Sequence, residues 1–281
     1  MSDLVGLLHD HLFGRPVARR IVHRVQRLLP APTYHVRRHA IAVARLPASL
    51  DGLRLLHVSD LHLREGSELA LRLPEVVGNV GHDLLVYTGD FIDTDGDIPG
   101  IERLLARMPA SPAFAVLGNH DHWRLGSHGV RNDVPRLVAV LERAGVKVLA
   151  NAACSILGGA LHVVGVDDPV TGQDDFPAAM RGVPVGACVL LLSHTPDIVL
   201  RLGSYRPGLV LAGHTHGGQI RLPLVGPVFR MSKLPRRAVM GFYQHDGVPF
   251  YVTSGIGYAG IDLRIACPPE VALLSLKAPP P

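Results

Sequence analysis

The chain has 281 residues, enough for one large domain or two small ones with a substantial buried core. Hydrophobic residues make up 47% and charged residues 19%, which excludes a mainly disordered or fibrous chain. The net charge is +4, but residues 1–45 carry eight arginines and two aspartates, a net of +6, whereas the remainder carries 20 basic and 22 acidic residues, a net of −2. The remainder therefore lacks the basic excess of a nucleic-acid-binding surface, and nucleic acid is a disfavoured partner.

The first 30 residues predict a basic amphipathic helix that ends at Pro30 and Pro32. Such a helix can lie on an anionic membrane surface, and it can equally pack on the domain's own core or on a partner subunit. No cleavable signal is evident. We expect a cytoplasmic protein, located at the inner face of the cell membrane if the helix binds lipid. Residues 1–45 are interpreted as a separate basic segment and residues 46–281 as the domain.

Beyond this segment, strand-like and helix-like stretches alternate, which predicts an α/β layered fold. Two short strands are expected on either side of Gly158-Gly159, and a second hairpin around Asp246-Gly247. The other predicted strands are 53–59, 83–88, 113–117, 146–149, 188–193, 209–212 and 271–276, and the predicted helices are 69–80, 101–108, 134–144 and 196–202.

Polar residues follow five of the predicted strands directly. Each has an ordinary structural explanation on its own, as a helix cap, a turn or a hydrogen-bonded histidine. Together they predict a ligand site at the carboxyl edge of a sheet, because converging imidazoles and carboxylates need a neutralising cation. The five groups are Asp60 with His62, Asp90 with Asp93, Asn119 with His120 and Asp121, His194, and His214 with His216.

Nitrogen and oxygen ligands without a thiolate favour Mn, Fe, Zn or Ni. A single ion would use three or four of these residues and leave the others unexplained. Two divalent ions would use an inventory of two carboxylates, four histidines and one asparagine amide in full if one carboxylate bridges the pair.

In their order and spacing, these groups resemble the signature of the calcineurin-like metallophosphoesterases over about residues 50–276. The motifs that carry the resemblance are Asp60-x-His62, Gly89-Asp90-x-x-Asp93, Gly118-Asn119-His120-Asp121, His194 and Gly213-His214-Thr215-His216. The resemblance implies two mixed β-sheets packed as a sandwich and flanked by helices. It also implies one metal held by Asp60, His62, Asp90 and His216, and a second held by Asp90, Asn119, His194 and His214.

The same resemblance implies that metal-activated hydroxide hydrolyses a phosphoester while His120 assists the leaving group and Asp93 orients His120. Asp121 either orients a ligand or caps the next segment, and Asp121 and Gln219 are candidate substrate-binding residues. Gly217-Gly218-Gln219 and the later Pro-rich segments are similar to a bacterial branch of phosphodiesterases and UDP-diacylglucosamine hydrolases. We therefore expect a phosphodiester or pyrophosphate substrate, lipid-linked or a nucleotide diphosphate, with Mn favoured. The alternatives are a phosphomonoesterase of broad specificity and a non-catalytic scaffold.

Residues 222–237 mix apolar and basic side chains without an acidic one. Three interpretations remain open: the segment covers a substrate with a phosphate head and an apolar portion, docks on a bilayer, or packs its apolar side on the domain.

Overall fold

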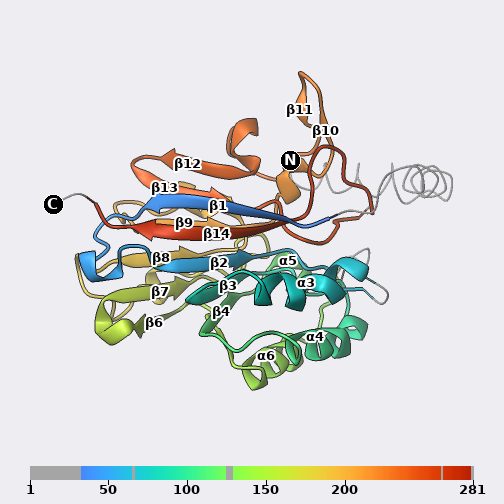
Figure 1. Cartoon of the computed structure of the whole chain (residues 1–281), viewed down its shortest axis with the longest axis horizontal. Coiled ribbons are helices and arrows are strands. Elements are labelled where there is room, and N and C mark those ends of the chain that lie inside the picture. The colour runs from blue at the N-terminus through green and yellow to red at the C-terminus, as the bar shows by residue number, and fades with distance from the viewer. Residues whose placement is uncertain (1–32, 65–66, 125–128, 261, 280–281) are drawn as a thin grey trace.

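The computed structural model describes residues 33–64, 67–124, 129–260 and 262–279, which form two six-stranded mixed β-sheets packed face to face (Figure 1). The first sheet has the order β1-β14-β2-β3-β4-β5, and the second has the order β12-β13-β9-β8-β7-β6. This is the predicted sandwich. The predicted helix over residues 1–30 lies outside the described residues.

The central strands of the first sheet are parallel to one another and run into the polar motifs. The sheet consists of β1 (His35–Ala42), β14 (Glu270–Lys277), β2 (Arg54–Val58), β3 (Leu84–Thr88), β4 (Ala113–Val116) and β5 (Val146–Val148). β14 pairs with β1 in parallel and with β2 antiparallel. Helices α3 (Glu68–Gly78), α4 (Ile98–Leu105) and α6 (Val134–Arg143) flank the strands of this sheet (Figure 1).

The second sheet likewise has a parallel centre, β7-β8-β9-β13, and antiparallel edge strands. Its strands are β6 (Ala152–Ile156), β7 (Leu161–Gly165), β8 (Val189–Leu192), β9 (Leu209–Ala212), β12 (Gly241–His245) and β13 (Val248–Val252). Both predicted hairpins are present, as β6–β7 and β12–β13. The remaining elements are α5 (Asn119–His122), α7 (Phe176–Ala179), the 3₁₀ helices η1 (Ala48–Leu50), η2 (Asp95–Asp97), η3 (Leu157–Gly159), η4 (Pro196–Leu200), η5 (His216–Gly218) and η6 (Arg236–Val239), and the short hairpin β10 (Arg221–Leu222) with β11 (Gly226–Pro227).

Three apolar cores hold these layers together. One joins the first sheet to its helices, one lies between the two sheets, and one covers the outer face of the second sheet. In the core between the sheets, Leu55 and Phe114 of the first sheet share a cluster with Leu190 and Leu209 of the second. Burial of these side chains fixes how the two sheets face each other. Among the described helices, none has the length and apolar character needed to cross a membrane.

The strand β1 shifts the start of the domain. Residues 35–42 pair with β14 along their whole length, so they belong to the first sheet and not to the basic segment 1–45. Arg37 and Arg38 made this stretch resemble the preceding basic residues. In the structure, Arg37 forms an ion pair with the buried Glu270 of β14, 2.9 Å away. This ion pair explains how the sheet accommodates a charged side chain at this position.

His57 is a core histidine, as its position in an apolar strand predicts. Its side chain is buried in β2, and Nε2 lies 2.8 Å from Thr88 Oγ1. Burial lowers the pKa of His57 from 6.5 to about 3. The folded protein therefore holds this imidazole neutral at a pH where an unfolded chain protonates it.

We expect His57 to make the protein less stable in acid. Between pH 6.5 and about 3 the unfolded chain binds a proton on His57 that the folded protein excludes. The free energy of unfolding should fall by up to about 1.4 kcal/mol per pH unit across that interval. Urea unfolding of the wild type and of His57→Gln, both in EDTA, measures the difference. Identical pH slopes for the two proteins would contradict the prediction.

Candidate metal centre

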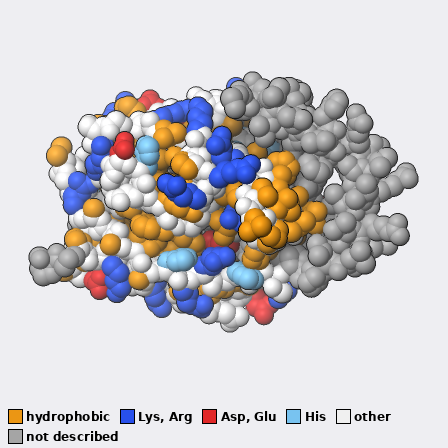
Figure 2. Space-filling model, turned by 90° about the horizontal axis from the view of Figure 1, so that it is seen from above, with side chains coloured by type: hydrophobic (Ala, Val, Ile, Leu, Met, Phe, Trp, Pro, Cys, Tyr) orange, Lys and Arg blue, Asp and Glu red, His pale blue; other side chains and the backbone are white. Residues whose placement is uncertain are grey.

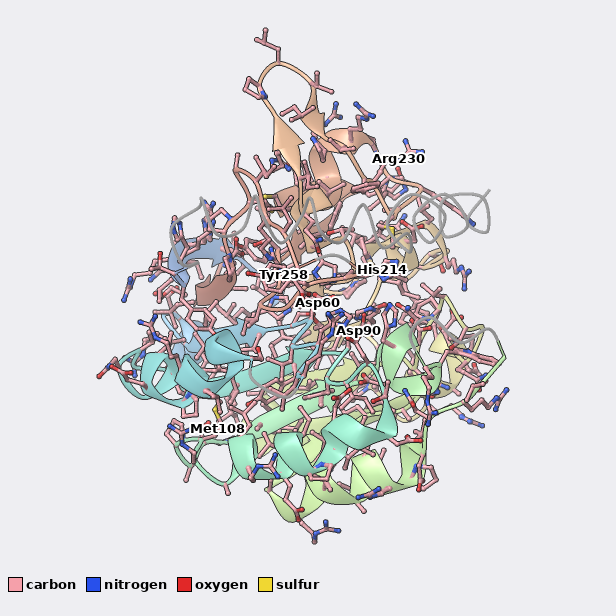
Figure 3. The ribbon with its side chains drawn as sticks, turned by 90° about the vertical axis from the view of Figure 1, so that its right-hand side faces the viewer. Asp60, Asp90, Met108, His214, Arg230 and Tyr258 are labelled. Atoms are coloured by element: carbon pink, nitrogen blue, oxygen red, sulfur yellow. The ribbon has the colours of Figure 1, made fainter. Side chains whose placement is uncertain are left out.

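The predicted ligands come together where the parallel strands of both sheets end. Asp60 and His62 follow β2, Asp90 follows β3, His194 follows β8, and His214 and His216 follow β9. Figure 3 shows Asp60, Asp90 and His214 gathered at this edge. One cluster contains Asp60, His62, Asp90 and His216, and a second contains Asp90, His194 and His214. Within each, the candidate ligand atoms all lie within 4.8 Å of one another, and every residue is buried.

Asp90 belongs to both clusters. Its Oδ2 lies 3.4 Å from His62 Nε2 and 3.1 Å from His194 Nε2. Asn119 Oδ1 lies 3.2 Å from the same His194 nitrogen, which places the predicted amide ligand beside the second cluster. This arrangement has the connectivity of a pair of metal sites that share one carboxylate.

Imidazole nitrogens face one another across both clusters. His62 Nε2 is 3.1 Å from His216 Nε2, and His194 Nε2 is 3.2 Å from His214 Nδ1. Two neutral nitrogens with facing lone pairs repel each other, so each pair needs a proton or a cation between them. A divalent ion that accepts both lone pairs satisfies this need.

The pKa shifts point to the same two positive charges. Although burial opposes protonation, Asp93 and Asp90 raise the pKa of His62 to about 10, and Asp90 raises that of His194 to about 10. Burial, together with the neighbouring charged imidazoles, lowers the pKa of His214 to about 3 and also lowers that of His216. Without an ion, each cluster would thus hold one imidazolium. The residues therefore fit a cation at each position.

The backbone is strained where it presents these side chains. Five of the candidate ligands have a positive φ, a left-handed conformation that residues other than Gly rarely adopt. The five are Asp60, His62, Asp90, His214 and His216, with φ of 53°, 40°, 54°, 67° and 48°. Such clustering at the ends of buried strands is characteristic of functional sites.

Asp121 supports the site from behind. Its carboxylate accepts hydrogen bonds from the backbone N–H groups of Asp90, Phe91, Ile92 and Gly118 at 2.8–3.2 Å. The side chain is fully buried. Burial and the nearby Asp90 raise the pKa of Asp121 to about 7. Both roles considered for Asp121 are present: it accepts from Gly118 N at the start of α5, and it holds the backbone of the candidate ligand Asp90. Its carboxylate is occupied by these backbone N–H groups, which does not fit the substrate contact that was also considered for Asp121.

Asp93 contacts a different histidine from the one expected. Its Oδ1 lies 2.7 Å from His62 Nδ1, and its Oδ2 accepts a hydrogen bond from Arg64. His120 Nδ1 is buried and has no hydrogen-bond partner among the described residues. Burial lowers the pKa of His120, although the charges of Asp90 and Asp93 act to raise it. The expectation that Asp93 orients His120 is therefore corrected: Asp93 orients the candidate ligand His62.

Gln219 lies next to the second sheet's histidines but uses its amide on the backbone. Its Oε1 accepts a hydrogen bond from Ala259 N at 2.9 Å, and its Nε2 donates to Ala259 O at 3.2 Å. These bonds join the loop after His216 to the loop after β13.

Two charged residues outside the predicted motifs complete the surroundings. Arg264 lies with Nη2 3.3 Å from His216 Nδ1 and donates to the carbonyls of Ser254 and Gly257. Asp168 is fully buried, and its charge acts to raise the pKa of His194. Residue type alone gives no signal for Arg264, because the Arg-rich composition makes one more arginine unremarkable.

The family model for calcineurin-like phosphoesterases matches residues 53–218, the segment that carries every candidate ligand. The chain belongs to this family. It is a metal-dependent phosphoric ester hydrolase of the calcineurin-like type, in agreement with the resemblance of its motifs.

Three bacterial relatives match over most of their length. The uncharacterized metallophosphoesterase YkoQ of Bacillus subtilis is 33% identical over 78% of this chain and 82% of its own. Phosphodiesterase YaeI of Escherichia coli is 31% identical over 79% of this chain and 82% of its own. The UDP-2,3-diacylglucosamine pyrophosphatase LpxG of Chlamydia trachomatis is 27% identical over 81% and 84%.

Among solved structures, the match with the phosphopantetheinyl hydrolase PptH of Mycobacterium tuberculosis covers 74% of this chain and 91% of the PptH chain. It has a TM-score of 0.44 and 14% sequence identity.

Gly118 leaves room for the shared carboxylate. Its φ of −112° is open to any residue, but a Cβ would overlap Asp90 Oδ1 and would lie 2.8 Å from His194 Cε1. We expect Gly118→Ala to weaken metal binding about 5- to 150-fold, the effect of roughly 1–3 kcal/mol of overpacking. Gly96→Ala is the matched control, because its Cβ would meet nothing closer than 3.5 Å. Metal titration of both variants tests this; equal affinities would contradict it.

Proposed function

We propose that the chain is a dinuclear metal-dependent phosphoesterase that hydrolyses a phosphodiester or pyrophosphate bond. The observation that carries the proposal is the position of Asp90 in both clusters, within 3.4 Å of a histidine from each sheet. Asp60, His62, Asp90 and His216 would hold one ion, and Asp90, Asn119, His194 and His214 the other. When bound, such cations offset phosphoryl charge and lower the pKa of a water that serves as nucleophile.

His120 is proposed to assist the departing oxygen. Its backbone N–H donates to Asp90 Oδ1 at 2.9 Å, and its ring centroid lies 5.1 Å from that of His62. Its Nδ1 is buried without a hydrogen-bond partner among the described residues, and we propose that the imidazole contacts a substrate oxygen. Burial keeps this imidazole neutral before substrate binds. An anionic phosphoester beside the ring would raise its pKa again and favour the protonated, proton-donating form.

The substrate class is proposed from the relatives' names. One relative is a phosphodiesterase and another a pyrophosphatase of a lipid-linked nucleotide, which supports a diester or diphosphate over a monoester. Mn is the favoured metal for a site of nitrogen and oxygen donors, with Fe, Zn and Ni as alternatives. We also propose that residues 1–30 contribute to peripheral association with the inner face of the membrane, on the strength of their basic amphipathic pattern.

Activity on model esters distinguishes this function from its alternatives. With Mn²⁺ added, the protein should hydrolyse bis(p-nitrophenyl) phosphate with a higher kcat/KM than p-nitrophenyl phosphate, and EDTA should abolish both activities. A preference for the monoester would indicate the phosphomonoesterase. Absence of turnover with two ions bound, as measured by elemental analysis, would indicate the scaffold.

Two substitutions separate metal binding from proton transfer. His120→Ala should lower kcat about 10²–10⁴-fold with the metal content unchanged, because the residue acts on the leaving group. Asp90→Ala should lose metal, because both sites lose a ligand. Elemental analysis and kinetics on both purified variants decide between the roles. Loss of metal from the His120 variant would contradict the division.

A further inference from the structure

The hairpin β10–β11 projects from the body of the protein next to the metal centre (Figures 1 and 3). It continues directly from η5, which begins at His216. Its backbone is joined to the loop that places Arg264 beside His216: Arg221 N donates to Ile265 O at 2.9 Å. A Cβ on Gly218 would overlap the Pro227 side chain and lie 2.8 Å from Phe229 O. The hairpin is thus packed closely against the loop that carries His216.

The tip of this hairpin is apolar and exposed. Residues 222–229 contain no side chain that can form a hydrogen bond. Leu224 is fully exposed at 108%, and three more apolar side chains are also exposed: Leu222, Val225 and Val228. Exposed apolar groups that gather in this way mark an interaction surface. In Figure 2 apolar side chains are seen to gather on one face, beside Lys and Arg.

Basic residues flank the tip in the sequence, and acidic ones are absent from the same stretch. Between Asp197 and Asp246 the chain has seven Lys and Arg residues and no Asp or Glu. Five of the seven lie at the base of the hairpin or just after it: Arg221, Arg230, Lys233, Arg236 and Arg237. Arg230 is exposed and has no ion-pair partner in the described part of the chain. The count by segment assigns the excess positive charge to residues 1–45. The hairpin and the residues just after it form a second basic region.

We propose that the β10–β11 hairpin docks on an anionic lipid bilayer, with the side chains around Leu224 entering the interface and the basic residues contacting lipid phosphates. An apolar tip that projects beyond basic residues at its base matches the depth profile of a bilayer surface, where the phosphates lie outside the hydrocarbon. A nucleic acid would complement the charge but not the apolar tip. The tip carries no hydrogen-bonding side chain with which to select a protein partner.

The hairpin's own hydrogen bonds make this insertion feasible. Val228 N donates to Ile220 O and Val225 N donates to Pro223 O, both at 2.8 Å. Pro223 and Pro227 have no N–H group to leave unpaired. Fewer free polar groups therefore enter the interface than an irregular loop would bring. Because the hairpin is packed on the His216 loop, docking would hold the metal-binding edge near the lipid surface. Delivery of a lipid-linked substrate to that edge rests on the proposed function, but the binding does not.

Leu224→Trp in the full chain tests the insertion directly. The chain has a single tryptophan, Trp123, which supplies the wild-type background. With vesicles of equimolar phosphatidylglycerol and phosphatidylcholine, the new emission should shift to shorter wavelength and be quenched by brominated acyl chains. The Trp123 emission of the wild type should not change in this way. If the variant co-sediments with vesicles without quenching of residue 224, another segment binds lipid and the proposal is overturned.

Matched charge substitutions test the energetic contribution of the tip. Leu224→Asp should weaken partitioning into the same vesicles at least about ten-fold, since it replaces a leucine that enters the lipid interface by a charge. Val185, in the loop between α7 and β8, is equally exposed at 105%, so Val185→Asp is the control and should leave partitioning unchanged.

Arg230→Gln should weaken binding roughly five-fold to the anionic vesicles only. Equal binding of wild type and Leu224→Asp, or a stable dimer in place of lipid binding, would refute the proposal. The measurement needs no turnover, so its failure is distinct from failure of the hydrolase assignment.

Discussion

The site depends on one buried carboxylate, that of Asp90. Removing a carboxylate from water is costly unless opposite charge and hydrogen bonds replace the water. His194 and His62 provide the charge, and their attraction holds the pKa of Asp90 well below its ordinary value despite its burial. The backbone N–H of His120 provides a hydrogen bond to Oδ1. Asp121 fixes the loop itself by accepting from the N–H of Asp90. All of these partners contact either the carboxylate or the backbone N–H of Asp90.

This constraint couples the fold to the chemistry. Asp90 belongs to the first sheet, and His194 belongs to the second, so their 3.1 Å contact exists only when the two sheets are packed together. The same is true of His62 and His216, which come from different sheets and lie 3.1 Å apart. A metal ion held by both sheets would add its binding free energy to the association of the two halves. Without metal, the apolar core between the two sheets holds the two halves together.

Much of this arrangement could be predicted from the sequence, because it depends on local patterns. The buried strands are continuous apolar runs, and polar motifs at their ends predict convergence at a sheet edge. What the patterns could not supply depends on tertiary contacts. β1 was missed because its charged residues are paired with a strand that lies over 200 residues away. The partner of Asp93 depends on the orientation of one side chain: the resemblance implied His120, and the structure has His62.

The distribution of charge shows the same limit of sequence counting. The domain beyond residue 45 is nearly neutral on average, which argued against a basic surface. Folding separates what the average combines: acidic groups such as Asp60, Asp90 and Asp121 are buried at the metal centre, whereas Arg230 and Arg237 remain exposed. The anions are neutralised internally by imidazoles or metal, so they do not offset the surface cations at a distance. A chain with a balanced count can therefore present a basic face, and here that face lies beside an apolar hairpin packed against the loop that carries His216.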